Sequence, residues 1–260
     1  MSLIKTQAIL IKSRRYKERD KLLTYVTEDN GKILSLCKGS RVTLNKWGSS
    51  TEPPNLSYIQ LYQINDFFTL TEIQGSQIFQ NIISDFQRSL TFSFISDILD
   101  SLLLPLSPSK NTYYLTLSSI YTLNKKEIDP ILLGYIFALK FLDVQGYRLE
   151  INNCVKCGKS INEDIKEFYL SLEEGGTLCK YCSKFANSFI TRLGEKETSF
   201  LKSIIQLDLR DIYLIQKLSS LENYENLDTM LISYYYLKFK KRIVSLAELI
   251  KKYDKRSNVV

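Results

Sequence analysis

The sequence predicts an α+β protein of several domains, in which a small β-barrel precedes an all-α domain that carries a four-cysteine module. Three observations support this prediction: short strand-like runs fill the N-terminal part, helical periodicity follows them, and four cysteines form two C-x2-C pairs. We predict segments at residues 1–75, 76–153, 154–182 and 183–260, of which the second and fourth form one helical domain.

Residues 1–75 contain five apolar runs separated by turn signals, and Asn30-Gly31 is a strong hairpin signal between the second and third runs. Five short strands with one long loop suit a closed barrel, and the OB-fold is the five-stranded barrel most often used to bind nucleic acid. An SH3-like barrel would give a similar pattern. The expected strands are residues 3–12, 21–27, 32–37, 56–62 and 67–73.

Helical periodicity begins after residue 76, and the clearest helix is expected from Pro130 to Gln145. Asp129 is its expected N-cap, Pro130 suits the first helical position, and Gly146 suits the C-terminal cap. This segment is apolar almost all round, so we expect it in the core of the helical domain. Further helices are expected at residues 196–206, 228–242 and 245–252.

The four cysteines Cys154, Cys157, Cys179 and Cys182 stand in a chain without histidine. Two C-x2-C pairs about twenty residues apart allow four thiolates to surround one ion tetrahedrally, as Zn²⁺ prefers. Without imidazole the ligand set is Cys₄. A closed Cys₄ site is normally structural, because catalytic zinc keeps one position open for water.

Disulfide bonding and redox chemistry are two other uses of such cysteines. Two disulfides would suit a secreted protein, but the polar start of the chain, residues 1–7, does not resemble a signal peptide, so a reducing cytoplasmic location is expected. A dithiol redox centre needs one C-x2-C pair and not two. The fifth cysteine, Cys37, lies in an apolar stretch and is expected to be a small buried hydrophobic residue.

The sequence contains few groups that could catalyse a reaction. The absence of histidine excludes the Ser-His-Asp and Cys-His arrangements and His-ligated catalytic zinc. Nucleotide-binding glycine motifs and the G-x-S-x-G nucleophile motif are also absent. The longest apolar run covers only residues 131–139, which is too short to span a membrane. We therefore expect a protein that is neither an enzyme nor a membrane protein.

Positive charge is concentrated near the two ends of the chain. Residues 1–50 hold eleven Lys and Arg against four Asp and Glu, whereas residues 51–260 hold 24 of each. Within the latter, residues 238–256 hold eight basic side chains against two acidic ones. A basic N-terminal module indicates a polyanionic partner, and nucleic acid is the commonest.

Candidate DNA-binding residues lie in two predicted loops of the barrel. Their cations would contact phosphates, and Tyr16 and Trp47 would stack on bases. Alternatively, these charges are solvated and the two aromatic rings are partly buried at the barrel rim; Glu18 and Asp20 also interrupt the first cluster. The candidates are Arg14, Arg15, Tyr16, Lys17, Arg19, Lys21, Lys38, Arg41, Lys46 and Trp47.

A third basic cluster comprises Lys238, Lys240, Lys241 and Arg242 at the end of the helix expected from residue 228. Positive charge there complements the helix dipole whatever the function. An auxiliary surface for DNA or a partner is the alternative.

Short motifs in a particular order make the chain resemble the RecO family of bacterial recombination mediators. The motifs are Tyr16-x-Glu18-x-Asp20-Lys21-Leu22-Leu23, Thr27-Glu28-x-x-Gly31-Lys32, Lys38-Gly39-x-Arg41, Gly48 with Glu52-Pro53, Gly146-Tyr147, Cys154-Val155-x-Cys157-Gly158, Gly175-Gly176-x-Leu178-Cys179-x-x-Cys182, and Ser245 after a basic helix end.

The resemblance implies an N-terminal OB-fold, a helical domain and a Cys₄ zinc module. It also implies a nucleoid-associated protein that binds single- and double-stranded DNA, anneals strands coated by single-strand-binding protein (SSB), and loads RecA indirectly together with RecR. Family members bind the acidic C-terminal tail of SSB through a pocket with arginines on the helix that corresponds to residues 129–147. Here Lys140 is the only basic residue between Asp129 and Tyr147, so we do not transfer that pocket.

Two alternatives from other classes are a zinc-ribbon regulator that reads DNA with residues 154–182 and a C-x2-C thiol oxidoreductase. The first is weakened because residues 154–182 carry more acidic than basic side chains, which makes them a poor reader of a DNA groove. A tightly bound zinc ion without a reactive thiol would count against the second.

Overall fold

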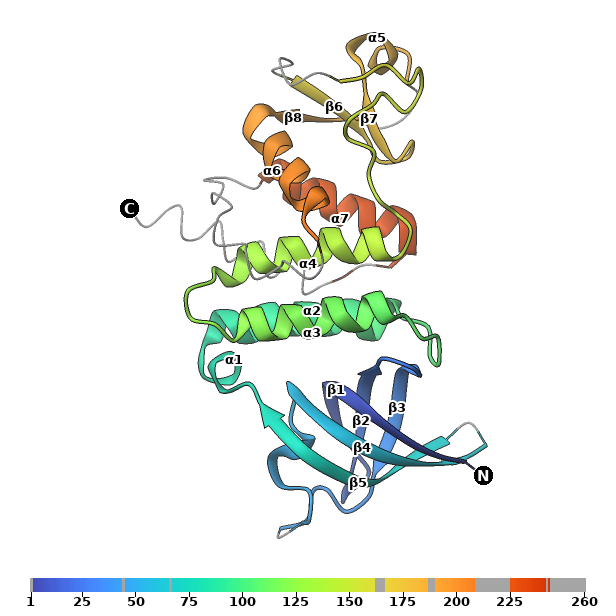
Figure 1. The fold of residues 1–260 in the computed structure, drawn as a ribbon, viewed down its shortest axis with the longest axis vertical. Coiled ribbons are helices and arrows are strands. Elements are labelled where there is room, and N and C mark those ends of the chain that lie inside the picture. Colours follow the sequence, from blue (N-terminus) through green and yellow to red (C-terminus); the bar gives the residue numbers. More distant parts are fainter. Residues whose placement is uncertain are drawn as a thin grey trace. The chain divides into compact units, whose positions relative to one another are not determined.

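The computed structural model describes residues 2–43, 45–65, 67–161, 167–186, 190–208, 225–241 and 243. The chain forms two compact units, an N-terminal unit of residues 1–126 and a C-terminal unit of residues 127–260 (Figure 1).

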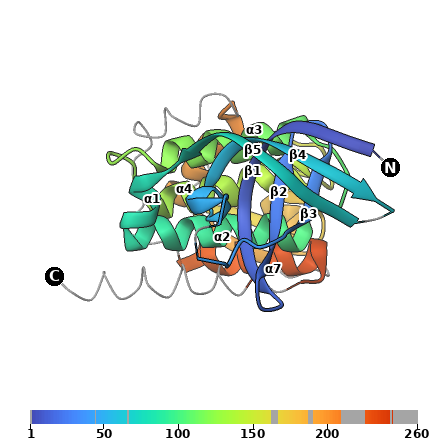
Figure 2. The same ribbon diagram turned by 90° about the horizontal axis from the view of Figure 1, so that it is seen from below.

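Five strands of the N-terminal unit form the predicted barrel, closed in the order β1-β2-β3-β5-β4. The β3–β5 pair is parallel, and the other pairs are antiparallel. Figure 2 shows the strands of the barrel curving past one another. The five-stranded barrel of the predicted fold class is therefore confirmed. Its strands are β1 (Ser2–Tyr16), β2 (Asp20–Thr27), β3 (Gly31–Cys37), β4 (Asn55–Ile64) and β5 (Phe67–Ile78).

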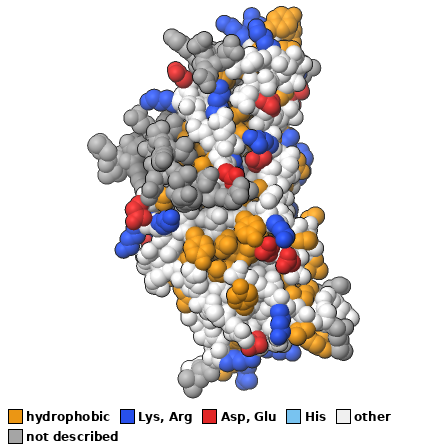
Figure 3. Space-filling view, viewed as in Figure 1, with side chains coloured by type: hydrophobic (Ala, Val, Ile, Leu, Met, Phe, Trp, Pro, Cys, Tyr) orange, Lys and Arg blue, Asp and Glu red, His pale blue; other side chains and the backbone are white. Residues whose placement is uncertain are grey.

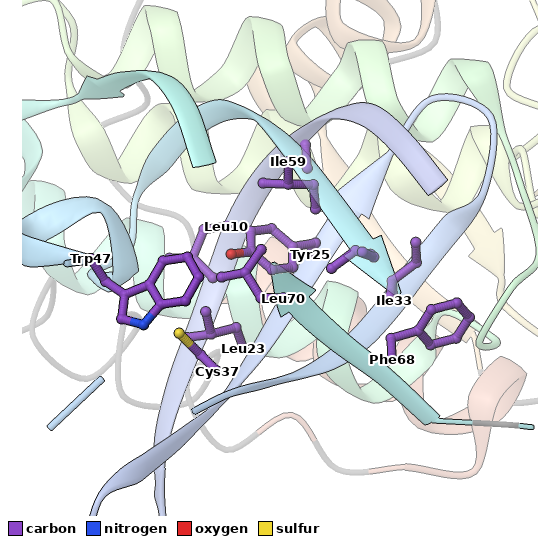
Figure 4. Packing of buried hydrophobic residues seen from close by; sticks show 11 residues of the cluster. Leu10, Leu23, Tyr25, Ile33, Cys37, Trp47, Ile59, Phe68 and Leu70 are labelled. Atoms are coloured by element: carbon purple, nitrogen blue, oxygen red, sulfur yellow. The ribbon is translucent and has the colours of Figure 1, made fainter. Parts of the chain in front are cut away.

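The barrel is filled by side chains from all five strands and one loop residue, Trp47 (Figure 4). Trp47 is only 8% exposed, and its indole N–H donates to the Lys38 carbonyl oxygen at 3.0 Å. Cys37 is fully buried, and burial raises the pKa of its thiol to about 11, which confirms the predicted buried hydrophobic role.

Strand β1 changes the direction of its side chains part of the way along. Its register with β2 shifts by one residue between Leu10 and Lys12. Ala8 and Leu10 belong to the barrel core. After the shift, Lys12 and Arg14 instead form ion pairs with carboxylates of helix α2 (Phe86–Leu102). Such a bulge moves every following side chain to the other face of the strand.

Three helices complete the N-terminal unit: α1 (Gln80–Ser84), α2 and α3 (Lys110–Leu123). Asp85 caps α2 by accepting from the Arg88 amide, and Ser109 caps α3. The buried Arg88 side chain donates to the carbonyl oxygens of Lys125 and Lys126 just after α3, at 2.6 and 2.8 Å. The Ser96 hydroxyl donates to the Ile11 carbonyl oxygen at 2.7 Å, which further joins α2 to β1.

The hairpin between β2 and β3 confirms the Asn30-Gly31 turn signal, because Thr27 pairs with Gly31 across it. Gly31 has φ +67°, and a Cβ atom there would lie 2.4 Å from the Ser107 carbonyl oxygen. Glycine is therefore required at position 31 for two reasons: the positive φ, and the close approach of the loop that contains Ser107.

The C-terminal unit contains the predicted apolar helix, which runs as α4 (Pro130–Val144). The Asp129 carboxylate accepts from the Ile131 amide at 2.8 Å, and Gly146 has φ +82°, so both predicted caps are confirmed. Its residues from Pro130 to Leu142 are buried. No helix among the described residues is long and apolar enough to cross a membrane.

Two further predicted helices appear as α6 (Glu195–Gln206) and α7 (Glu225–Phe239), whereas the helix expected at residues 245–252 lies outside the described residues. A three-stranded sheet has the order β7-β6-β8, and the second cysteine pair follows its strand β7. The remaining elements are η1 (Gly48–Thr51), β6 (Glu167–Ser171), β7 (Gly176–Leu178), α5 (Lys180–Ser183) and β8 (Ile190–Gly194).

Replacing Gly31 by Ala should reduce the free energy of unfolding more than replacing Gly39 by Ala. The two glycines have nearly the same φ, so the difference between the variants reports the contact of the new Cβ with Ser107. Gly39 has φ +66° with open space around it, so Gly39→Ala should cost about 1–2 kcal/mol from the left-handed backbone alone. Gly31→Ala should cost about 1–3 kcal/mol more from overpacking against Ser107. Urea unfolding measures both, and equal losses would contradict the contact with Ser107.

Candidate metal centre and nucleic-acid interface

The four predicted cysteine ligands converge in the C-terminal unit. All sulfur atoms of Cys154, Cys157, Cys179 and Cys182 lie within 4.8 Å of one another, and none is in a disulfide. The Cys157 and Cys179 sulfurs are 3.8 Å apart. Four sulfurs at about 2.3 Å from one ion at tetrahedral angles are about 3.8 Å apart, so the geometry fits a single bound metal ion.

Backbone hydrogen bonds hold the two C-x2-C pairs against each other. The Thr177 amide donates to the Glu150 carbonyl oxygen at 2.8 Å, and the Val155 amide donates to the Thr177 carbonyl oxygen at 2.9 Å. Gly176 directly precedes Thr177, and a Cβ atom there would be 2.4 Å from the Glu150 carbonyl oxygen. The second glycine of the Gly175-Gly176 motif therefore permits the close approach of the first cysteine pair.

Within each pair, a tight turn directs backbone amides toward sulfur. The Gly158 amide donates to the Cys154 carbonyl oxygen at 2.8 Å with Gly158 at φ +71°, and the Cys182 amide donates to the Cys179 sulfur at 3.4 Å. Burial raises the pKa of the Cys154 thiol, but hydrogen bonds from the amides of Cys179, Cys157 and Lys156 outweigh it and lower the pKa to about 6. This environment favours a thiolate at Cys154.

The two basic loops of the barrel, separate in the sequence, meet in the structure. The Arg41 amide donates to the Arg19 carbonyl oxygen at 3.0 Å, and the Arg41 guanidinium donates to the Lys17 carbonyl oxygen at 2.9 Å. The Gly39 amide donates to the Asp20 carboxylate at 2.8 Å. These bonds fix the loop after β3 beside the β1–β2 turn.

A depression of about 520 Å³ lies where these loops meet, and we call it the basic depression. Lys21 in its wall forms an ion pair with Glu52, so part of its charge is neutralised. Arg15 and Arg41 form no ion pair with a described residue. The depression is lined by Ser13, Arg15, Lys21, Ser40, Arg41, Val42, Thr43, Asn45 and Glu52.

The other predicted cations lie outside this lining. Arg14 points toward helix α2, where it forms an ion pair with Asp100. The Lys46 ammonium lies 4.3 Å from the centre of the Trp47 ring. Lys17, Arg19 and Lys38 are exposed on the surrounding loops.

The two aromatic candidates differ in environment. Tyr16 is 38% exposed at the end of β1, with the Lys17 ammonium 5.5 Å from its ring centre. Trp47 instead packs in the barrel core beneath Lys46, so in this structure its ring is not available to stack on a base. The sequence analysis did not identify the small polar side chains that line the basic depression, such as Ser13. Ser13 could have been found from the sequence, because it lies two residues before Arg15 and therefore on the same face of a strand.

The C-terminal basic cluster is described only in part, because Arg242 lies outside the described residues. The Lys238 ammonium lies 5.2 Å from the Tyr234 ring centre and 5.8 Å from that of Tyr147. Lys240 and Lys241 are exposed after α7. The cluster therefore combines ring contacts with exposed charge.

Lys140, the only basic residue of α4, is buried and donates to the Ile205 carbonyl oxygen at 3.0 Å. Burial lowers the pKa of Lys140. The Lys140 ammonium therefore forms a hydrogen bond inside the C-terminal unit.

Comparison with known proteins gives concordant matches along the chain. Residues 1–79 match the family model "Recombination protein O N terminal", and residues 83–231 match "Recombination protein O C terminal". Relatives named "DNA repair protein RecO" include those of Clostridium novyi, 27% identical over 94% of this chain and 93% of the relative, and Caldicellulosiruptor bescii, 28% identical over 94% and 96%. That of Clostridium perfringens is 30% identical over 78% of this chain and 81% of the relative.

Replacing Gly176 by Ala should reduce the metal bound per chain, because the added methyl group would push Glu150 and the first cysteine pair away from the second. Gly194→Ala is the matched control, since its Cβ would meet only the Glu197 carboxylate at an ordinary 3.7 Å. Elemental analysis of the purified proteins measures the bound metal. Full metal content in Gly176→Ala would contradict this account of the site.

Proposed function

The chain belongs to the recombination protein O (RecO) family, and from that premise we propose how it serves DNA repair and recombination. It binds single- and double-stranded DNA without reading the sequence, anneals complementary strands, and helps to load RecA on DNA coated by SSB. The observation that carries this proposal is the convergence of Arg15, on strand β1, and Arg41, in the loop after β3, on the basic depression.

The depression suits the DNA backbone better than it suits bases. Guanidinium groups bind phosphate oxygens in bidentate fashion, and the Ser13 hydroxyl and the second amide N–H of Asn45 can donate further hydrogen bonds to them. Contacts of this kind provide affinity and orientation but carry no direct sequence information. Lys17, Arg19 and Lys38 extend the positive surface around the depression, and Tyr16 offers one exposed ring for stacking.

We assign RecR, the SSB tail and, indirectly, RecA as partners on the basis of family membership. Because the Lys140 ammonium binds Ile205 inside the unit, the SSB tail must use cations elsewhere in this chain. The surface of Lys238, Lys240 and Lys241 is the candidate that we propose for an auxiliary contact with DNA or a partner.

We propose that the metal ion is Zn²⁺ and that it is structural. All four ligands are thiolates, which Zn²⁺ favours, and with four protein ligands no position stays open for a substrate. Bound zinc would hold residues 154–161 against β7 and α5, since metal binding in such sites adds directly to folding stability.

We also propose that the protein acts by binding and not by covalent catalysis. A thiol oxidoreductase would need two cysteines free to form a disulfide, whereas here four sulfurs surround one point. We call residues 154–186 the metal module. A regulator that reads a DNA groove with this module would rely on the paired hydrogen bonds that Arg, Asn and Gln form best with base edges, and residues 154–161 and 167–186 contain none of the three.

Annealing of two complementary fluorescent oligonucleotides coated with the cognate SSB tests the proposed activity. The protein should accelerate annealing, and the acceleration should fade as salt rises, because phosphate contacts release counterions. Absence of acceleration together with absence of DNA binding would overturn the proposal.

Replacing both Arg15 and Arg41 by Gln should weaken binding to single-stranded DNA and reduce the slope of log K against log salt by about 1.4, or about 0.7 per phosphate contact. The control is Lys110→Gln, which removes another exposed cation, on helix α3 beside Glu28. Fluorescence anisotropy across a salt series measures the slopes. Equal slopes for the double variant and wild type would contradict the role of the basic depression.

A further inference from the structure

A pair of aromatic side chains is exposed on the metal module, in a position that the sequence analysis did not single out. Tyr181 in α5 is 73% exposed and Phe185 just after it is 65% exposed. Their ring centres are 5.1 Å apart with the planes inclined at 52°. Tyr181 and Phe185 are four residues apart, so they project on the same side of the helical turn. Adjacent exposed rings offer apolar faces to a binding partner.

Lysines surround this aromatic pair. Lys180 and Lys184 come from the same turn, and Lys159 comes from the first cysteine pair; together with Tyr181 they line a hollow of about 530 Å³. Figure 3 shows blue and orange side chains side by side over α5, at the top of the view. The rest of the described lining is Cys157, Ser160, Ile161 and Cys179, which contains no carboxylate.

The local charge of this surface is therefore opposite to that of the whole segment 154–182. Among the described ion pairs, the one carboxylate of the module that approaches a lysine is Glu174, which binds Lys156 at 3.2 Å. Lys159, Lys180 and Lys184 form no ion pair with a described residue. Three cations around two exposed rings form a surface with affinity for an anion that also presents aromatic faces.

We propose that the α5 surface, comprising Lys159, Lys180, Tyr181, Lys184 and Phe185, is a second binding site for single-stranded DNA. The lysines contact phosphates while the two rings stack on unpaired bases, which offer a π face whatever their sequence. A duplex hides its base faces, so stacking makes this site selective for single strands. The inference rests on the proposed DNA-binding function and extends it from the barrel to the metal module.

Photocrosslinking with an oligonucleotide that contains 5-iodo-2′-deoxyuridine tests the site directly, because the excited base reacts with an aromatic ring stacked on it. Mass spectrometry of the full-length, metal-loaded protein should find crosslinks to Tyr181 or Phe185 in addition to any at the barrel. Crosslinks at the barrel alone would overturn the second site and leave the proposed function intact. Absence of DNA binding by the wild type would instead overturn the proposed function.

Affinity measurements give an independent test in a chain that already carries Arg15→Gln and Arg41→Gln. Adding Tyr181→Ala and Phe185→Ala should weaken residual binding to a twenty-nucleotide oligo-dT by about tenfold or more, since each stacked base contributes measurably. Binding to a duplex of the same length should change less. Tyr236→Ala, which removes a Tyr that is 56% exposed on α7, is the matched control. Unchanged metal content verifies that the module is folded.

Two other results would contradict the inference. An equal loss for single strands and duplex would mean that the rings do not stack on bases. An acidic peptide ending in Phe that binds wild type and loses binding in Tyr181→Ala with Phe185→Ala, while oligo-dT binding is unaffected, would assign the surface to a protein partner.

Discussion

The one-residue register shift between Leu10 and Lys12 of β1 is the constraint on which the N-terminal unit depends. Before the shift, Ala8 and Leu10 fill the barrel. After it, Lys12 and Arg14 bind the carboxylates of α2, whereas Ser13 and Arg15 on the opposite face line the basic depression. One strand thus attaches a helix to the barrel and supplies the basic face that we assign to DNA, because successive side chains point in opposite directions.

Hydrogen bonds that involve backbone groups bring the distant parts of both sites together. In the barrel, Arg41 and Gly39 bind the β1–β2 turn, so the loop after β3 joins Arg15. In the metal module, the hydrogen bonds of Thr177 with Glu150 and Val155 hold one cysteine pair beside the other in addition to any bonds to a metal ion. Placement of this kind lowers the ordering cost of binding a ligand, because less conformational entropy is lost when the ligand arrives. Both surfaces that we assign to DNA are therefore supported by regular hydrogen bonding.

The sequence was most predictive where one local rule determines the structure. Asp129, Pro130 and Gly146 mark the ends of α4, and the cysteine spacing alone identifies four sulfur atoms that converge. Burial was harder to predict: Trp47 lies among basic residues in the sequence but fills the barrel core, because a core position is decided by tertiary packing. The α5 surface was missed for a related reason. The net charge of residues 154–182 averages over side chains that the fold separates, such as Glu174 and Lys180.

Hydrogen–deuterium exchange of the protein with and without single-stranded DNA tests the central claim, that DNA lies in the basic depression, most directly. Bound DNA should slow exchange of the amides in the β1–β2 turn, residues 16–20, and in the loop of residues 38–43, because both segments border the depression. Hydrogen exchange at the end of the barrel away from the depression should be unchanged. DNA binding that leaves both segments unprotected while it slows exchange in α3 or α7 would contradict the account.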